Sequence, residues 1–359
     1  MISEGLSPKE IEIENLFCKL GYFTRSHIQV FPIDLKNSAS DIDVFAVKLS
    51  PYLKPDLKLI EVKEGYGTAT SLFQLYGFKS YFQASQAYLV AQRMHNTTRE
   101  ISKSLGIDVF TFDRLKSLVA SEVEWMEQKK RTIIELDISH MKKIAEYLAA
   151  VKSLNEELFW AYHYTWLITD PYKKFNDLQR LFSKTGNLVT DEKTNDFEAI
   201  SWFKRELFCL ALLSAAYIAS DCIDLENDKL FQYIENRFYN IGGSKEGKLK
   251  VKEGIEKLSE QIEQLSKGMV KVPPVHVIQT YVPNLVKLVG LLIKNAPYVQ
   301  SYLTVDNNIF RADLKRENRN LTTFASSDAQ YRIIRETNNL MLKIMYEGNP
   351  VEMTFKDFV

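Results

Sequence analysis

The segment SASDIDVFAVKLSPYLKPDLKLIEVKEG, residues 38–65, contains two apolar runs, IDVFAV and LKLIEVK, with the composition of buried β-strands. Both runs carry charges: Asp43 opens the first, and Glu61 and Lys63 interrupt the second. The prolines in the intervening LSPYLKPD indicate a connection between the strands. Burial of one unpaired carboxylate costs several kcal/mol, so strands carry such charges only if something compensates them.

Glu61 and Lys63 are two residues apart, so their side chains leave the same face of a strand. A hairpin-like return from the first strand would bring Asp43 beside them. Two carboxylates this close repel each other unless a cation lies between them. A few oxygen ligands suit Mg²⁺, which keeps several waters and accepts a phosphate oxygen, and a lysine beside the ion can orient an attacking water. The pattern therefore favours hydrolysis of a phosphodiester with Mg²⁺ or Mn²⁺.

The elements around these strands predict an α/β domain with a central mixed sheet over residues 1–118. Ser7 and Pro8 form a helix-start pattern, with serine as the N-cap and proline in the first turn, and Gly21 ends that helix. The other predicted elements are strands at 25–33, in the two apolar runs, at 87–92 and at 108–112, and helices at 71–85 and 97–107. The predicted order is helix, three strands, helix, strand, helix, strand.

Residues 119–359 are predicted to form a mostly α-helical domain, because their apolar residues recur with helical periodicity and strand patterns are scarce. The helical segments are 115–128, 139–154, 199–220, 229–238, 250–269, 281–295 and 328–347. The breaks between them, including TDPYKKFND at 169–177, are predicted to be loops. We expect this domain to bind substrate, to form oligomers or to regulate the first domain.

The composition indicates a soluble cytoplasmic protein. Cys18, Cys209 and Cys222 are far apart and lack zinc-site spacing, which is typical of reduced, buried thiols. The start MISEGLSPKE lacks the features of a secretory signal, and the most apolar run, 207–223, is short for a membrane span and is expected to be a core helix. No Gly-rich phosphate loop is present, so no nucleotide cofactor is expected.

Lys and Arg total 46 residues and Asp and Glu also total 46, so the net charge is zero. A protein that binds DNA by itself usually carries a positive balance. We therefore expect a homodimer or a complex with a partner protein, and weak activity of the isolated chain.

Asp43, followed by Glu61-Val62-Lys63 on the next apolar strand, resembles the signature of the PD-(D/E)XK, or restriction-endonuclease-like, nucleases. The predicted order of elements is similar to the core of that fold, and Holliday-junction resolvases and Mrr-type restriction enzymes are the more similar members. In those proteins a first-helix glutamate precedes a Gly-aromatic pair, as Glu10 precedes Gly21-Tyr22 here. The resemblance covers roughly the first third of the chain.

The resemblance implies a Mg²⁺- or Mn²⁺-dependent endonuclease acting on DNA. Asp43 and Glu61 would hold the metal with the Val62 carbonyl, Lys63 would position the water, and Glu10 would assist as an outer ligand. Gln74, on the following helix, resembles a glutamine that some members place near the metal or the DNA backbone. Nuclease domains joined to helical domains also resemble restriction and antiviral defence effectors.

Several alternatives remain open at the level of sequence. Asp41 lies two residues before Asp43 and competes for its role. Glu10 could complete a capping box with Ser7, in which case Glu14 is the alternative acid. Gln74 could be an ordinary residue of a helix surface. Glu61 and Lys63 could form an ion pair on an edge strand.

Other features suggest further alternatives. The five histidines have no metal or nucleophile spacing and receive no role, and the aromatic run 159–166 is expected to be core rather than a base-stacking surface. The basic clusters at 128–131, 245–252 and 311–318 are expected to be solvated helix faces rather than phosphate contacts. RNA is the alternative substrate, and a non-catalytic nucleic-acid or protein-binding module is the alternative function.

Overall fold

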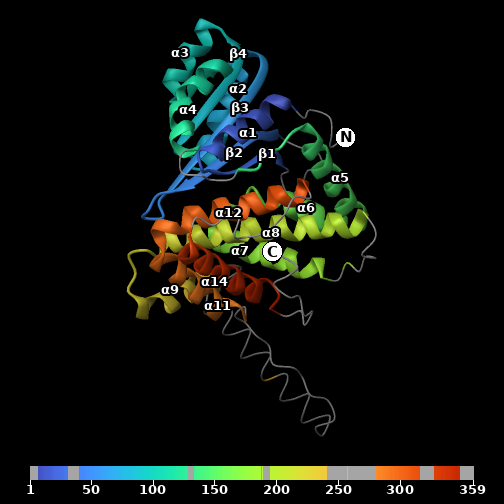
Figure 1. The fold of residues 1–359 in the computed structure, drawn as a ribbon, viewed down its shortest axis with the longest axis vertical. Coiled ribbons are helices and arrows are strands. Elements are labelled where there is room, and N and C mark those ends of the chain that lie inside the picture. The colour runs from blue at the N-terminus through green and yellow to red at the C-terminus, as the bar shows by residue number, and fades with distance from the viewer. Residues whose placement is uncertain are drawn as a thin grey trace.

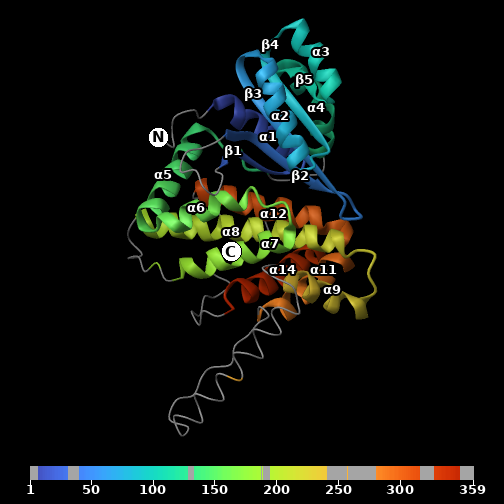
Figure 2. The same cartoon turned by 180° about the vertical axis from the view of Figure 1, so that it is seen from behind.

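The computed structural model describes residues 7–30, 40–127, 133–186, 195–240, 280–315 and 327–347, with Leu188 and Lys257. These residues form a five-stranded mixed sheet with its helices, placed on one side of a mostly helical part (Figures 1 and 2). The strands are β1 (Phe23–Val30), β2 (Ser40–Leu49), β3 (Pro55–Gly67), β4 (Gln86–Met94) and β5 (Asp108–Thr111). The helices that accompany the sheet are α1 (Pro8–Lys19), α2 (Ala69–Tyr81), α3 (Asn96–Leu105) and α4 (Phe112–Glu127).

The order of elements expected from the sequence is confirmed. The strands follow one another across the sheet as β1-β2-β3-β4-β5. The pairs β1/β2 and β2/β3 are antiparallel, and β3/β4 and β4/β5 are parallel, because α2 and α3 form the crossover connections. β3 therefore lies between β2 and β4 in the interior of the sheet.

Two apolar clusters cover the two faces of the sheet. Ile13 and Phe17 of α1 and Leu115 of α4 lie in one cluster with Val44 and Ile60 of the central strands. The alternate residues of the same strands, such as Phe45 and Leu59, belong to the other cluster with Leu72 and Leu75 of α2. This second cluster continues into the helical part, where Trp166 packs edge-on against Phe45 with ring centroids 5.6 Å apart. The α2 face of the sheet and the helical part therefore share one core, whereas the α1 and α4 face has a core of its own.

The helical part is built around α8, whose apolar side chains are buried along most of its length. The core helix expected over residues 207–223 lies in α8 and the turn after it, and no described helix is long and apolar enough to cross a membrane. The helices are α5 (Ile138–Leu154), α6 (Glu156–Thr165), α7 (Pro171–Thr185), α8 (Asn195–Asp221), α9 (Asn227–Asn240), α11 (Val282–Lys294), α12 (Ala296–Lys315) and α14 (Asp328–Met345). The helix expected over 250–269 lies outside the described residues, apart from Lys257.

The prediction of a loop over 169–177 was wrong. α7 begins at Pro171, and the Asp170 side chain caps it by accepting hydrogen bonds from the main-chain N–H groups of Tyr172 and Lys173. Proline is favourable in the first turn of a helix, where its missing N–H group costs no hydrogen bond. The domain boundary expected after residue 118 falls inside α4, which runs to Glu127.

A buried ion pair joins the sheet to the helical part. Arg25 of β1 donates from Nε and Nη2 to the Glu206 carboxylate of α8, with the Nη2–Oε2 distance at 2.7 Å. The same guanidinium donates to the Thr24 carbonyl and lies over the Phe310 ring of α12, 4.0 Å from its centroid. At the same end of these two strands the Leu49 N–H of β2 donates to Gln300 of α12 over 2.6 Å. β1 and β2 are thus held directly by the helical part.

We expect Arg25→Met to reduce the free energy of unfolding by about 3–5 kcal/mol, because it leaves the Glu206 carboxylate buried without its partner. The double variant Arg25→Met/Glu206→Leu should lose less than Arg25→Met alone, since no lone charge remains. Urea unfolding measures both. Lys229→Ala, which breaks the exposed pair with Glu226, is the control and should change stability by less than about 0.5 kcal/mol. Equal losses in the single and double variants would contradict this account.

Candidate active site

Asp43, Glu61 and Lys63 converge on one face of the sheet. The β2/β3 register pairs Val44 with Ile60, which sets Asp43 opposite Glu61 at the next position. The Lys63 Nζ atom lies 2.7 Å from Glu61 Oε1 and 3.9 Å from Asp43 Oδ2. Both carboxylates are buried, whereas the Lys63 side chain is 39% exposed. The ammonium group therefore closes the outer side of a pair of buried acids.

The alternative of a solvent-facing pair on an edge strand is wrong. β3 is an interior strand with β2 and β4 on either side, and Glu61 is only 3% exposed. An interior strand gives these acids no access to water, so neighbouring groups must offset the free-energy cost of their burial.

The main chain of Val62 contributes to the compensation. Its N–H donates a 2.6 Å hydrogen bond to Asp43 Oδ2, which fixes the orientation of that carboxylate. The role of the Val62 carbonyl as a metal ligand stays a prediction. Asp41 is half-buried and pairs with Gln29 across β1/β2, and its negative charge raises the pKa of Glu61.

The electrostatics of the site favour an added cation. The pKa of Asp43 is raised to about 8, chiefly by burial and then by the charges of Glu61 and Glu10, which together outweigh the opposing effects of the Val62 N–H and Lys63. Burial likewise raises the pKa of Glu61 against the effect of Lys63. For Lys63, burial lowers the pKa, but the hydrogen bond and charge of Glu61 outweigh it and the net shift is upward. Lys63 is therefore an ammonium, but it does not suffice to ionise both acids, because Asp43 keeps a proton at neutral pH that an added cation would displace.

Glu10 points inward from the first turn of α1. It is buried, and its Oε2 lies 3.6 Å from Nδ1 of His27 on β1. The Ser7 hydroxyl caps α1 by accepting from the Lys9 N–H, and it donates to Glu64 over 2.6 Å. The Glu10 carboxylate is thus directed at His27 and the acids rather than used at the cap.

Glu14, the alternative acid, has a structural partner. Its Oε1 lies 2.5 Å from Nη2 of Arg311, which is fully buried on α12, and its Oε2 accepts from the Ser26 hydroxyl. This pair also corrects the prediction for the basic cluster at 311–318, because Arg311 lies in the core rather than on a solvated face. The clusters at 128–131 and 245–252 lie outside the described residues.

His27 is a site residue that the sequence did not identify. It lies opposite Asp43, between the register pairs Ser26↔Val44 and Ile28↔Ile42, and its φ of 51° is in the left-handed region. Such a conformation is uncommon for a non-glycine residue and often marks a functional position. The contact with Glu10 and its negative charge raise the pKa of His27 in spite of burial. Histidine spacing along the chain contains no signal of this arrangement.

Gln74 lies at the margin of the site. It is exposed on α2, and its side chain donates to the Ser40 hydroxyl at the start of β2. Lys79, five residues further along α2, donates to the Gly106 carbonyl instead. Neither residue contacts Asp43, Glu61 or Lys63 in the described part of the chain, so the role of Gln74 stays a prediction.

Among the described residues, no three His, Cys, Asp or Glu side chains form a cluster that could hold a metal ion. Glu10 therefore stands outside a three-acid ligand set, although its charge raises the pKa of Asp43. The acids available to hold one ion directly are the pair Asp43 and Glu61.

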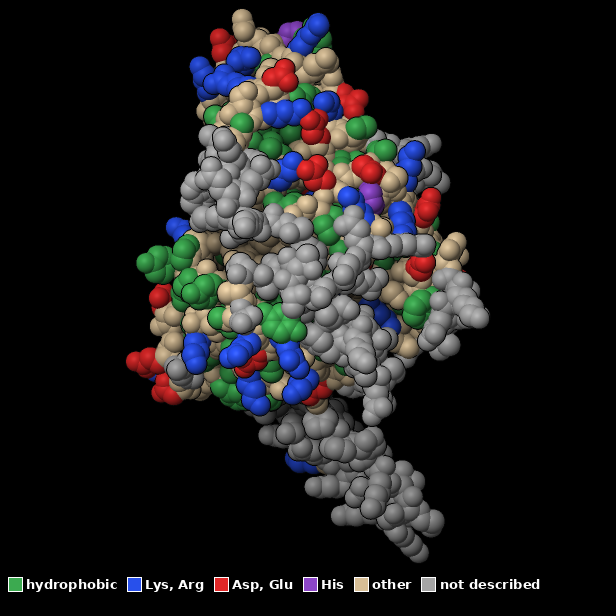
Figure 3. Space-filling model, viewed as in Figure 1, with side chains coloured by type: hydrophobic (Ala, Val, Ile, Leu, Met, Phe, Trp, Pro, Cys, Tyr) green, Lys and Arg blue, Asp and Glu red, His purple; other side chains and the backbone are tan. Residues whose placement is uncertain are grey.

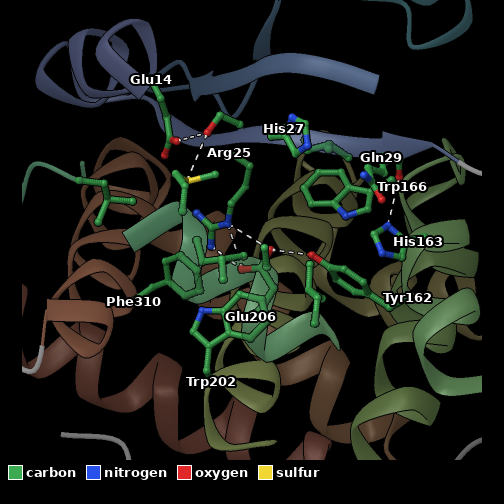
Figure 4. A pocket seen from close by; sticks show the side chains of 17 residues that line it. Glu14, Arg25, His27, Gln29, Tyr162, His163, Trp166, Trp202, Glu206 and Phe310 are labelled. Carbon is green, nitrogen blue, oxygen red and sulfur yellow. Dashed lines mark hydrogen bonds and ion pairs between the residues drawn. The ribbon is translucent and has the colours of Figure 1, made fainter. Parts of the chain in front are cut away.

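A cavity of about 60 Å³ lies between β1 and the helices α5, α6, α8 and α12 (Figure 4). Trp166, Trp202 and Phe310 line it with the Arg25–Glu206 pair. This volume is well below the roughly 150 Å³ of an apolar cavity that admits one benzene ring, so the cavity does not enclose a nucleotide. The aromatic run 159–166 is buried beside this cavity, which confirms that it is core.

All three cysteines are buried and free, as expected. A scan against protein-family models, a search of curated proteins and a search of solved structures found no match to this chain. A functional proposal therefore depends on the geometry of Asp43, Glu61 and Lys63.

In EDTA, the wild type should lose stability as the pH rises from about 4 to 8. The pKa of Asp43 is raised from 3.8 to about 8, so the folded protein holds a proton there that the unfolded chain releases. Asp43→Asn removes this effect and should be more stable than the wild type at pH 8 by roughly 2–4 kcal/mol. Thermal and urea unfolding at pH 5 and pH 8 measure the difference.

The control is Asp56→Asn. Burial raises the pKa of Asp56, but hydrogen bonds from Ser85 and Tyr22 and the charge of Lys58 outweigh it and lower the pKa, so this variant should be less stable at pH 8. Mg²⁺ should raise the melting temperature of the wild type at pH 8 and leave Asp43→Asn unchanged. A wild type whose stability is flat between pH 5 and pH 8 would argue against the electrostatic account.

Proposed function

We propose that this protein is a metal-dependent endonuclease that hydrolyses DNA phosphodiester bonds, with a restriction-endonuclease-like domain formed by the sheet and its helices. The observation that carries the proposal is the convergence of Asp43, Glu61 and Lys63 from two adjacent strands, with both acids buried and the lysine reaching solvent. The order of elements around them agrees with the PD-(D/E)XK resemblance.

The side chains at this site fit Mg²⁺ or Mn²⁺. Asp43 and Glu61 offer carboxylate oxygens, which are the ligands that these ions prefer, and the Val62 carbonyl is adjacent. The Oε2 atom of Glu10 is buried without a hydrogen-bond partner among the described residues, which suits a contact with a metal-bound water. A bound ion would polarise the scissile phosphate and stabilise the charge that develops on it.

Lys63 is the residue that would act on the water and the phosphate. Glu61 holds its ammonium group 2.7 Å away, and the pKa of Lys63 is raised, so it is a hydrogen-bond donor rather than a base. A donor at this point orients the attacking water in line with the leaving oxygen and attracts the phosphate. The Val62 N–H holds Asp43 in place while this happens.

The helical part would bind substrate, form a homodimer or control the nuclease together with a partner protein. Its role as part of a restriction or antiviral defence effector is an analogy from architecture. The zero net charge favours control by a partner. RNA would suit the same site chemistry and is separated from DNA by the substrate panel below.

Plasmid DNA, single-stranded DNA and RNA should be incubated with the wild type and Lys63→Ala in Mg²⁺, Mn²⁺ or EDTA. We expect metal-dependent cleavage of DNA that falls about 10²–10⁴-fold in Lys63→Ala, because the positioned donor is lost. Lys79→Ala, which removes another lysine of the same domain, should cleave as the wild type does.

Cleavage that is unchanged in Lys63→Ala or that persists in EDTA would refute the proposal. If no protein cleaves, the effect of Mg²⁺ on the melting temperature distinguishes an enzyme that requires a partner from a non-catalytic binding module. A shift in the wild type that is absent from Asp43→Asn would indicate an enzyme that requires a partner, and no shift in either would indicate a binding module.

A further inference from the structure

The end of β3 carries a bulge that changes the direction of one tyrosine. In the parallel β3/β4 register, Lys63 pairs with Ala91 and Tyr66 pairs with Arg93, so three steps on β3 oppose two on β4. Residues paired across two strands point to the same face of a sheet, so this extra residue places Tyr66 on the face of Lys63 and Glu61. Without the bulge Tyr66 would point to the opposite face.

Tyr66 is already part of a ring stack. Its ring lies 4.6 Å from the His95 ring with an angle of 14° between the planes, and the Arg93 guanidinium lies 6.0 Å from the Tyr66 centroid. Tyr66 is 47% exposed, and His95 and Arg93 are also exposed. A large aromatic ring that is held in a stack and still half-exposed is suited to receive a further flat ring.

Several basic side chains surround Tyr66, although Glu64 and Glu100 are also exposed nearby. Arg93 donates to the Tyr66 hydroxyl over 3.4 Å, Lys63 lies on the same sheet face, and Arg99 and Lys103 are exposed on α3. Figure 3 shows Lys and Arg side chains at this α3 end of the molecule, with Asp and Glu side chains among them. Phosphate groups complement such a surface.

The distance from Lys63 to Tyr66 is on the scale of a nucleotide, because the bulged segment advances by two residues of β4, which span about 7 Å. A base stacked on Tyr66 would therefore belong to a nucleotide close to the phosphate at Lys63. A base inside a duplex is stacked between its own neighbours, so only an unpaired base can place its face on a protein ring.

We propose that Tyr66, supported by His95, receives an unpaired base next to the scissile phosphate, so that the substrate is DNA with a single-stranded segment at the cleavage point. This inference rests on the proposed nuclease function for the position of the phosphate, but the stacking itself requires no catalysis. It assigns a substrate class and a specificity-determining residue to the end of β3.

The test is binding of single-stranded DNA that contains 2-aminopurine, in EDTA so that no metal-dependent cleavage occurs. The wild type should quench the 2-aminopurine fluorescence and bind the single strand more tightly than the matched duplex. Tyr66→Ala should weaken single-strand binding about tenfold and remove the quenching. Tyr66→Phe keeps the ring and should behave as the wild type.

The matched control is Tyr52→Ala, since Tyr52 is 80% exposed in the turn at the opposite end of β3. It should bind as the wild type does, and thermal unfolding should show that Tyr66→Ala is folded. Absence of single-strand binding by the wild type, equal binding by Tyr66→Ala, or equal affinity for the duplex would each overturn the inference. RNA bound in place of DNA would also overturn it.

The cleavage panel separates this failure from failure of the nuclease proposal. Tyr66-dependent binding with no cleavage in any metal, and no Mg²⁺ shift of the melting temperature, would leave the stacking site intact and refute the nuclease. Metal-dependent cleavage that does not change in Tyr66→Ala would leave the nuclease intact and refute the stacking site.

Discussion

The burial of the Arg25 guanidinium against Glu206 is the interaction on which the rest of the structure depends. Two charges taken out of water cost several kcal/mol each, and their attraction recovers this only when geometry and hydrogen bonding are nearly ideal. Arg25 meets that condition, because Glu206, the Thr24 carbonyl and Asn307 accept its hydrogen bonds and Phe310 covers its plane. β1 therefore has a fixed position on α8 and α12. Because β1 pairs with β2, the position of the rest of the sheet is fixed as well.

A second buried pair extends the constraint to α1. Arg311 of α12 holds Glu14 and also donates to Thr24 of β1, so one helix of the helical part fixes both elements that flank the candidate site. Those two elements supply Glu10 and His27, and β1 pairs with the strand that carries Asp43. Any event that moves the helical part would reach the acids through α1 and β1, which gives the proposed regulatory role a physical route.

The sequence predicted what local periodicity determines. The alternation along the strands and the two-residue spacing of Glu61 and Lys63 were sufficient to place those side chains together with Asp43. The helix α12 was not expected, since buried polar residues such as Asn307 and Asn308 interrupt its apolar pattern. Ion pairs between residues far apart in the sequence could not be predicted either. Glu14 and Arg311 are 297 residues apart, and no spacing rule connects them.

The difference between the structural and the candidate functional charges lies in their balance. Arg25–Glu206 and Arg311–Glu14 each match one cation to one carboxylate, and the Nη1 group of each arginine makes further hydrogen bonds. In the candidate site, by contrast, burial and the charges of Asp41 and Glu10 all raise the pKa of Glu61. The Lys63 ammonium group opposes this shift. A core built for stability alone would pair these acids or replace them with apolar residues, since excess buried charge of one sign is destabilising. The surplus of carboxylate oxygens at one point of an interior strand is what a divalent cation would neutralise, and it is the physical reason to look for catalysis there.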